Sequence, residues 1–214
     1  MRDGRTWGTE QGCSLRSPKV WAIGLFFFCA LTCNYAYQFS APAMLQAATG
    51  WSVTHVGYLV ACFGLAGAAA MLLNGAHSDR TRERRMHVVV PCVVMAAGYV
   101  AASCSGWGWL TAAALGTSFV AFMGFQGPAL AVPTEFLAGR AAAAGIAAMN
   151  TITMFSGFVG PYWMGAMKDA TGSYQAGLGG LVVPSLLAGG VMWGLTLALE
   201  RKPVAVAKLG EEPA

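Results

Sequence analysis

Residues 74–87 read NGAHSDRTRERRMH, and they concentrate charge in an otherwise apolar chain. The charged members are Asp79, Arg80, Arg82, Glu83, Arg84 and Arg85. No Lys, Arg, Asp or Glu occurs in residues 20–78 or 86–134, and two more charge-free intervals cover 141–167 and 170–199. A helix needs about 20 apolar residues to cross a bilayer, so the first two intervals each hold two crossings and the last two hold one each. The pattern predicts an all-α membrane protein with six transmembrane helices.

The overall composition agrees with a membrane protein. Of the 214 residues, 56% are hydrophobic and only 10% are charged, whereas a soluble domain is about a quarter charged. We expect a six-helix membrane domain over residues 20–199, with polar segments 1–19 and 200–214 on either side. Pro42 and Gly50 are expected to separate the first two spans. The predicted spans are 20–41, 54–74, 88–105, 109–131, 142–166 and 177–199.

The basic residues predict the orientation of the chain, because cytoplasmic loops carry an excess of Lys and Arg. Lys168 is the one basic residue expected on the outer side, and it stands beside Asp169. Both termini are therefore predicted to be cytoplasmic, in a cell (inner or plasma) membrane. The twelve basic residues expected on the cytoplasmic side are Arg2, Arg5, Arg16, Lys19, Arg80, Arg82, Arg84, Arg85, Arg140, Arg201, Lys202 and Lys208.

Several classes of function are not indicated. The six Cys show no metal-ligand spacing, and Cys29 and Cys33 share a helix face without a His or an acidic residue in the same span. We interpret them as small packing residues. No nucleophile–base pair or phosphate-binding loop is visible, so neither an enzyme nor a cofactor is expected. The net charge of +4 lies in loops between apolar helices, so we expect no nucleic-acid partner.

An internal repeat relates the two halves of the chain. GAHSDRT (75–81) follows the second predicted span and GAMKDAT (165–171) follows the fifth, with Gly, Ala, Asp and Thr at identical offsets. By the count of basic residues, the first copy lies inside and the second outside. A repeated motif with opposite sidedness predicts two inverted three-helix units.

The order of charges in the first copy resembles a known signature. Gly75-x-x-x-Asp79-Arg80-x-x-x-Arg84-Arg85 resembles the loop between the eighth and ninth helices of the major facilitator superfamily. Residues 78–91, 132–150 and 157–177 are similar to its anion:cation symporter branch, which includes transporters of sugar acids and hydroxy-dicarboxylates such as tartrate and glucarate. The resemblance covers about residues 18–199 and implies the C-terminal six-helix half of such a transporter, which works by alternating access.

The resemblance implies a cytoplasmic gate in the charged stretch. A carboxylate at a helix end can pair with Arg, and a neighbouring Gly allows helices to approach closely. The implied gate residues are Gly75, Asp79, Arg80, Arg84 and Arg85. Without the resemblance, the same charges are better explained as a topological anchor.

Polar residues inside the spans are the candidates for contact with substrate, because polar groups in lipid are costly and tend to face a cavity. Few exist: Asn34, Tyr35, Tyr37 and Gln38 in the first span, Gln126 in the fourth, and Asn150, Thr151 and Thr153 in the fifth. The resemblance matches Asn150 to an Asn beside the ligand and Tyr35 to a pocket-facing Tyr. We expect substrate contacts from Asn150, Tyr35, Gln126, Gln38 and Thr153. The alternative for each is a hydrogen bond between helices, worth about 0.6–2 kcal/mol.

The expected partners follow from what the chain lacks. No Asp or Glu lies within a predicted span, so a coupling ion, most simply a proton, would have to bind in the missing half. The expected protein partner is a complementary six-helix half or a second copy of the chain. The other predicted partners are a small organic anion, as substrate, and the lipid bilayer that surrounds the helices. A second hypothesis remains open, namely a membrane protein that does not transport, either a truncated remnant or a structural or regulatory partner.

Overall fold

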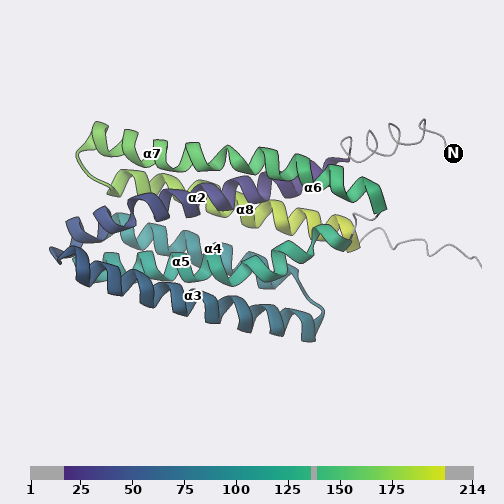
Figure 1. Ribbon diagram of the computed structural model, residues 1–214, viewed down its shortest axis with the longest axis horizontal. Coiled ribbons are helices and arrows are strands. Elements are labelled where there is room, and N and C mark those ends of the chain that lie inside the picture. The colour runs from purple at the N-terminus through teal and green to yellow at the C-terminus, as the bar shows by residue number, and fades with distance from the viewer. Residues whose placement is uncertain (1–16, 136–138, 201–214) are drawn as a thin grey trace, which may run out of the picture.

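The computed structural model describes residues 17–135 and 139–200 and shows an elongated bundle of helices (Figure 1). Seven of the twelve basic residues that are predicted to be cytoplasmic have side chains outside the described part of the chain, namely Arg2, Arg5, Arg16, Arg140, Arg201, Lys202 and Lys208.

Seven helices and one short 3-10 turn, Pro133–Glu135, make up the described chain. Six helices, counting α6 and α7 as one broken span, are long and apolar enough to cross a membrane, which confirms the predicted fold class. The break falls at Phe155. The helices are α2 (Pro18–Thr49), α3 (Val53–Thr81), α4 (Arg85–Cys104), α5 (Gly108–Ala131), α6 (Gly139–Met154), α7 (Ser156–Thr171) and α8 (Gln175–Glu200).

Two predicted helix ends are wrong. Pro42 lies inside α2, which ends only at Gly50, where the backbone is left-handed (φ 71°) and the Gly50 N–H donates to the Gln46 carbonyl at 2.9 Å. A proline removes one helical hydrogen bond, but ending a helix within lipid exposes several backbone groups, so continuing the helix costs less. The charged stretch is also mostly helical, because α3 runs to Thr81 and only residues 82–84 connect it to α4.

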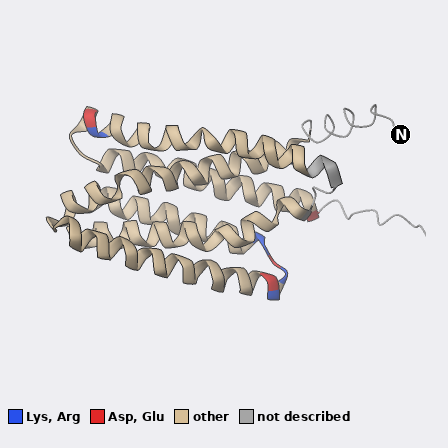
Figure 2. Cartoon of the chain, in the orientation of Figure 1, with Lys and Arg blue, Asp and Glu red and all other residues tan. Residues whose placement is uncertain are grey.

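The packing of the helices has the symmetry expected of two inverted repeats. Helix α3 packs on α5 as α7 packs on α2, and α4 packs on α5 as α8 packs on α2. Helix α6, which precedes α7 in the same span, also packs on α2, and the contacts of α4 with α8 and of α2 with α5 join equivalent helices of the two units. The two copies of the repeated motif end α3 and α7, and their charged residues lie at opposite ends of the bundle (Figure 2).

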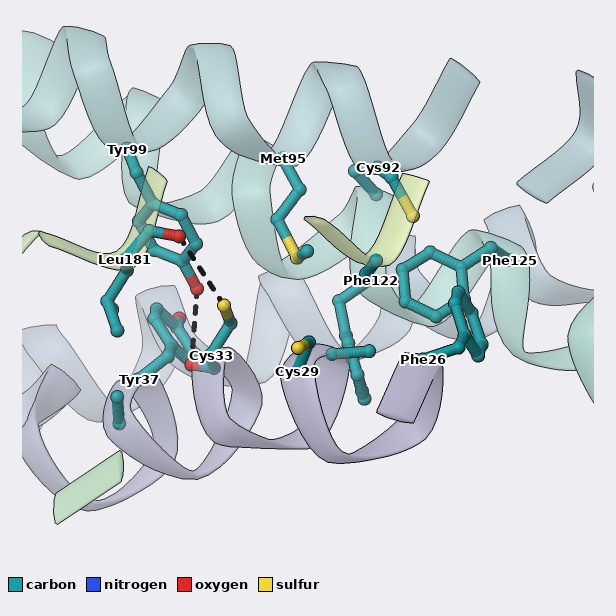
Figure 3. Close-up of a cluster of buried hydrophobic side chains, with 14 of the residues drawn as sticks. Phe26, Cys29, Cys33, Tyr37, Cys92, Met95, Tyr99, Phe122, Phe125 and Leu181 are labelled. Atoms are coloured by element: carbon teal, nitrogen blue, oxygen red, sulfur yellow. Dashed lines mark hydrogen bonds between the residues drawn. The ribbon is translucent and has the colours of Figure 1, made fainter. Parts of the chain in front are cut away.

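The core forms where α2 meets α4, α5 and α8 (Figure 3). The Tyr99 hydroxyl donates to the Cys33 carbonyl at 3.2 Å, and the Cys33 thiol lies 3.6 Å from the Leu181 carbonyl. The rings of Phe26 and Phe125 meet edge to face at 5.7 Å. Cys29 and Cys33 are both buried, as expected of packing residues.

Burial differs sharply between helices. In the apolar segment of α2, 61% of the residues are buried, against 11% in α3. Leu65 and Leu72 of α3 and Phe158 and Tyr162 of α7 are all exposed. These two helices therefore present apolar faces that either lipid or further protein must cover.

The contact between α2 and α7 predicts a sensitive glycine. A Cβ at Gly160 would lie 2.5 Å from the Thr32 carbonyl oxygen and 2.8 Å from the Ala36 nitrogen, which are backbone atoms of α2. Gly160→Ala should therefore push the helices apart and destabilise the fold by about 1–3 kcal/mol. The measurement is the thermal melting of the purified chain in detergent.

Gly165→Ala is the matched control, because it lies on the same helix and its added Cβ would meet nothing within 4 Å. Equal melting temperatures for the Gly160 and Gly165 variants would contradict the close packing of α7 on α2.

Candidate functional site

Two of the predicted substrate residues lie near the middle of α2. Tyr35 is half-buried, and its ring faces Gly157 of α7, where an added Cβ would lie 3.8 Å away. Gln38 is exposed three residues further on, so it stands on nearly the same side of the helix. The middle of a membrane domain is where transporters place their substrates.

Asn150 and Gln126 lie beside a different part of α2, near Gly24 and Phe26. Asn150 is exposed on α6 and follows Met149, which packs against Gly24 of α2. Gln126 is half-buried on α5 and follows Phe125, whose ring contacts Phe26 of α2. This part of α2 is about ten residues from Tyr35, or about 15 Å along the helix. The four predicted residues therefore do not meet in one site of small-molecule size.

Thr153 and Thr151 hydrogen-bond within their own helix. Thr153 is buried, and its hydroxyl donates to the Met149 carbonyl at 2.7 Å. The Thr151 hydroxyl donates to the Ala147 carbonyl at 2.9 Å. The expectation that Thr153 faces substrate is not supported by this position, because its side chain is enclosed between helices.

Two other polar residues of α2 have buried atoms without a partner. Among the described residues, neither Asn34 Oδ1 nor the Tyr37 hydroxyl has a hydrogen-bond partner, and both side chains are buried. The Tyr37 ring stacks on Phe119 of α5 at 5.0 Å. Leaving a buried polar atom unpaired costs about 1–3 kcal/mol, so these atoms could accept a bond from a ligand or a water. The sequence showed that both residues were polar, but their burial became visible only in the fold.

Asn74 joins three helices at the other candidate site, the connection between α3 and α4. Its amide nitrogen donates to the carbonyls of His87 in α4 and Gly124 in α5, both at 2.8 Å. Asn74 is the first residue of the charged stretch, but the sequence alone did not indicate a role for it. An amide that bridges two backbone carbonyls holds the end of α3 against the bundle.

The charged residues of this connection form separate pairs. Asp79 and Arg84 lie 3.7 Å apart, with 71% and 29% of their side chains exposed. Arg85 instead pairs with Glu200 of α8 at 2.8 Å and lies 5.2 Å from the centre of the Trp193 ring. Arg80 is exposed. An exposed ion pair contributes about 0–1 kcal/mol, so the contact between Asp79 and Arg84 is easily broken.

The expected role of Gly75 in the gate stays a prediction. A Cβ added to Gly75 would meet nothing within 4 Å. The approach of α3 to α5 at this end therefore does not depend on Gly75 in this conformation.

A chain of hydrogen bonds runs from Glu83 to His77. Glu83 Oε2 lies 2.9 Å from His87 Nδ1, and His87 Nε2 lies 2.7 Å from His77 Nδ1. The other Glu83 oxygen accepts from the Met86 N–H at 2.7 Å. If His87 Nδ1 carries the hydrogen and donates to Glu83, its Nε2 can accept a hydrogen bond from His77 Nδ1. No group of three metal-binding side chains occurs within the described ranges.

These contacts change the acidity of Glu83. Partial burial raises the pKa of its carboxyl, but the bonds from the Met86 N–H and from His87 lower it more, and the net pKa is below its ordinary value. The carboxylate is therefore favoured in the folded state, where it caps the start of α4.

Comparison with known proteins identifies relatives of this chain. Residues 10–213 match the Major Facilitator Superfamily. A protein named "Putative tartrate transporter" from Agrobacterium vitis is 38% identical over 90% of this chain and 42% of its own length. "Putative metabolite transport protein NicT" from Pseudomonas putida is 34% identical over 75% of this chain and 37% of its own length. The chain thus spans about two fifths of the length of these relatives.

The role of Glu83 gives a prediction about pH. Because its folded pKa is lowered, the stability that it contributes is present above its ordinary value of 4.5 and is lost as pH falls through the lower folded value. Glu83→Gln should lower the free energy of unfolding near neutral pH by less than about 1 kcal/mol, because the pair with His87 is partly exposed, and the melting temperature should fall slightly with it. Thermal melting of the two proteins across pH measures the difference.

The difference between the two proteins should shrink as pH falls below 4.5. A difference that stays constant down to strongly acidic pH would show that the charge of Glu83 contributes nothing.

Proposed function

The chain belongs to the Major Facilitator Superfamily, and from that membership we propose that it forms the C-terminal six-helix half of a transporter for small organic anions. The proposed substrates are hydroxy-dicarboxylates or sugar acids. The observation that carries the proposal is the 38% identity with a protein named as a tartrate transporter over 90% of this chain.

The uncovered faces of α3 and α7 support a partner of the same size. Transporters of this fold bind substrate between two six-helix units that rock against each other. The exposed apolar residues of α3 and α7 could pack against the other unit, either a complementary half or a second copy. The polar residues of α2 would then face the path between the units.

Asn34, Tyr35 and Gln38 are the proposed contacts for substrate near the membrane centre. They can supply hydrogen bonds but no charge. Residues 20–78 contain no Lys or Arg, and burying an unpaired anion costs far more than neutral hydrogen bonds return. The cation that pairs with the substrate, and the site of a coupling proton, are therefore proposed to lie in the other half. Asn150 and Gln126 would contact substrate at a later point of its path.

Asp79, Arg80 and Arg84 are proposed to act in a gate. The pair of Asp79 and Arg84 is weak and exposed, which suits a contact that must open in every cycle. Asn74 and the pair of Arg85 with Glu200 would hold the surrounding helix ends in place.

The proposed orientation predicts which residues react from each side. With both termini in the cytoplasm, a Cys at position 173 should react with an impermeant thiol reagent added to intact cells. A Cys at position 81 should react only after the cells are opened, because Thr81 lies at the end that carries the basic cluster.

The unmodified chain serves as the control, since Cys62 and Cys104 are also exposed. Labelling of the Thr81→Cys variant in intact cells, above that background, would contradict the orientation.

Uptake tests the proposed function. Joined to the N-terminal half of a tartrate transporter, the chain should support tartrate uptake into cells, and the chain alone should not.

Gln38→Ala and Tyr35→Phe should each lower kcat/KM of the joined protein about tenfold or more, because a hydrogen bond to a charged group is worth about 1.5–3 kcal/mol. Asp79→Asn should lower the uptake rate at equal abundance in the membrane.

Thr151→Ala is the matched control, because its hydroxyl bonds within its own helix, and it should leave uptake unchanged. No uptake by the joined protein would favour the non-transporting alternative. Unchanged uptake by the Asp79→Asn variant would indicate that the charged stretch serves only as a topological anchor.

A further inference from the structure

Three side chains at the end of α3 connect it to the segment that follows. Asn74 donates to the His87 carbonyl at 2.8 Å, and the Ser78 hydroxyl donates to the Glu83 carbonyl at 2.9 Å. The ring of His77 meets the ring of His87, with Nδ1 of the first 2.7 Å from Nε2 of the second. Positions 74, 77 and 78 lie three and four residues apart, so they share one face of the helix. Because α3 and α4 pack mainly on α5, these contacts link the two helices directly.

The bond between the two histidines is the one of these three contacts that depends on protonation. The Asn amide and the Ser hydroxyl do not change charge near neutral pH, whereas a histidine does so between about pH 5 and 8. His77 is exposed, so protons reach it from water. The side chain of His87 is only 12% exposed, and its Nδ1 lies 2.9 Å from a carboxylate oxygen of Glu83.

The number of protons on the two rings decides whether they can bond. A carboxylate only accepts hydrogen bonds, so His87 Nδ1 must carry a hydrogen to bond to Glu83. With both rings neutral, His87 Nε2 then accepts from His77 Nδ1. One added proton keeps this bond, because it can bind to the other nitrogen of His77 while Nδ1 still donates. A second proton must bind to His87 Nε2, so that two N–H groups face each other and the bond is lost.

The surrounding charges favour separation once both rings are charged. Helix α5, Gly108–Ala131, contributes no charged or titratable side chain to this end of the bundle. Asp79 pairs with Arg84 and Arg85 with Glu200, so Glu83 is the carboxylate that bonds to the histidines. Two charged histidines would repel each other and the excess of arginines. The charged residues at this end, besides the histidines, are Asp79, Arg80, Arg82, Glu83, Arg84, Arg85 and Glu200.

We propose that His77 and His87 form an acid-sensitive latch between α3 and α4, which is closed with no or one added proton and opens when both rings are charged. Opening loosens the last turn of α3, which carries Asp79, while Asn74 and Ser78 keep the helix attached. The latch thereby links the acidity of the adjoining solution to the contact between Asp79 and Arg84.

Hydrogen–deuterium exchange of the full chain in phosphatidylcholine nanodiscs tests the latch, because amide exchange reports local opening. The amides of residues 77–81, which end α3, are followed at about pH 7.5 and about pH 5, the limits of histidine titration. Labelling times are scaled for the slower chemical exchange of amides in acid. Glu83 stays ionised in both solutions, because its pKa lies below the ordinary value of 4.5.

Exchange at the end of α3 should be about fivefold faster in acid, since the net contribution of one hydrogen bond is modest. Residues 168–175, at the opposite end of the bundle, contain no histidine and should keep their exchange rate. His77→Gln keeps a side chain that can bond to His87 but cannot be charged, so its exchange should not respond to acid.

His55→Gln is the matched control, because His55 lies at the opposite end of the same helix and bonds to Ser52 at 2.8 Å. This variant should respond to acid as the unmodified chain does. If His77→Gln does not insert into the membrane, His87→Gln removes the other partner of the same bond and should abolish the response.

An equal response to acid in the unmodified chain and in His77→Gln, or no response in either, would overturn the proposal. Faster exchange along the whole chain, residues 168–175 included, would also overturn it, because acid would then destabilise the fold in general. Loss of the response in His55→Gln would do the same. Because exchange requires no substrate, failure of tartrate uptake by the joined protein would count against the proposed function alone.

Discussion

The cost of polar groups in hydrocarbon is the constraint on which this structure depends. Lipid offers no hydrogen bonds, so each span must satisfy its own backbone and charges must stay at the ends. This explains why α2 continues through Pro42 and why hydroxyls such as those of Thr151 and Thr153 bond to carbonyls one turn earlier. It also explains why the charges of residues 79–85 gather at one end of the bundle (Figure 2).

Two buried polar atoms of α2, Asn34 Oδ1 and the Tyr37 hydroxyl, have no hydrogen-bond partner among the described residues. Asn34 and Tyr37 lie in the most buried helix of the bundle, beside Tyr35 and Gln38. Elsewhere the fold pairs its buried polar groups, as where Tyr99 and Ser185 contact Cys33. Leaving Asn34 Oδ1 and the Tyr37 hydroxyl unpaired costs stability. This is consistent with a position where a ligand or a water molecule supplies the missing hydrogen bonds.

The two ends of the bundle carry the two copies of the repeated motif but differ in their contacts. At one end, Asn74, the Glu83–His87–His77 chain and two ion pairs connect α3, α4, α5 and α8. At the other, Lys168 and Tyr174 form a single contact beside a hollow. The first arrangement holds the ends of several helices together, whereas the second joins α7 to the turn that follows it.

The sequence by itself determined the number of spans and the inverted repeat, because charge-free intervals and repeated motifs are properties of the chain alone. It also pointed to Tyr35 and Gln38 as polar residues within a span. Only the tertiary structure showed that Asn150 and Gln126 lie beside a part of α2 that is about ten residues, or about 15 Å of helical rise, from Tyr35. It also showed that Thr153 is buried and that Arg85 pairs with Glu200. The position of a residue along the bundle, its burial and its hydrogen-bond partners depend on how separate helices pack. The sequence pattern of one helix does not show which helices will pack against it.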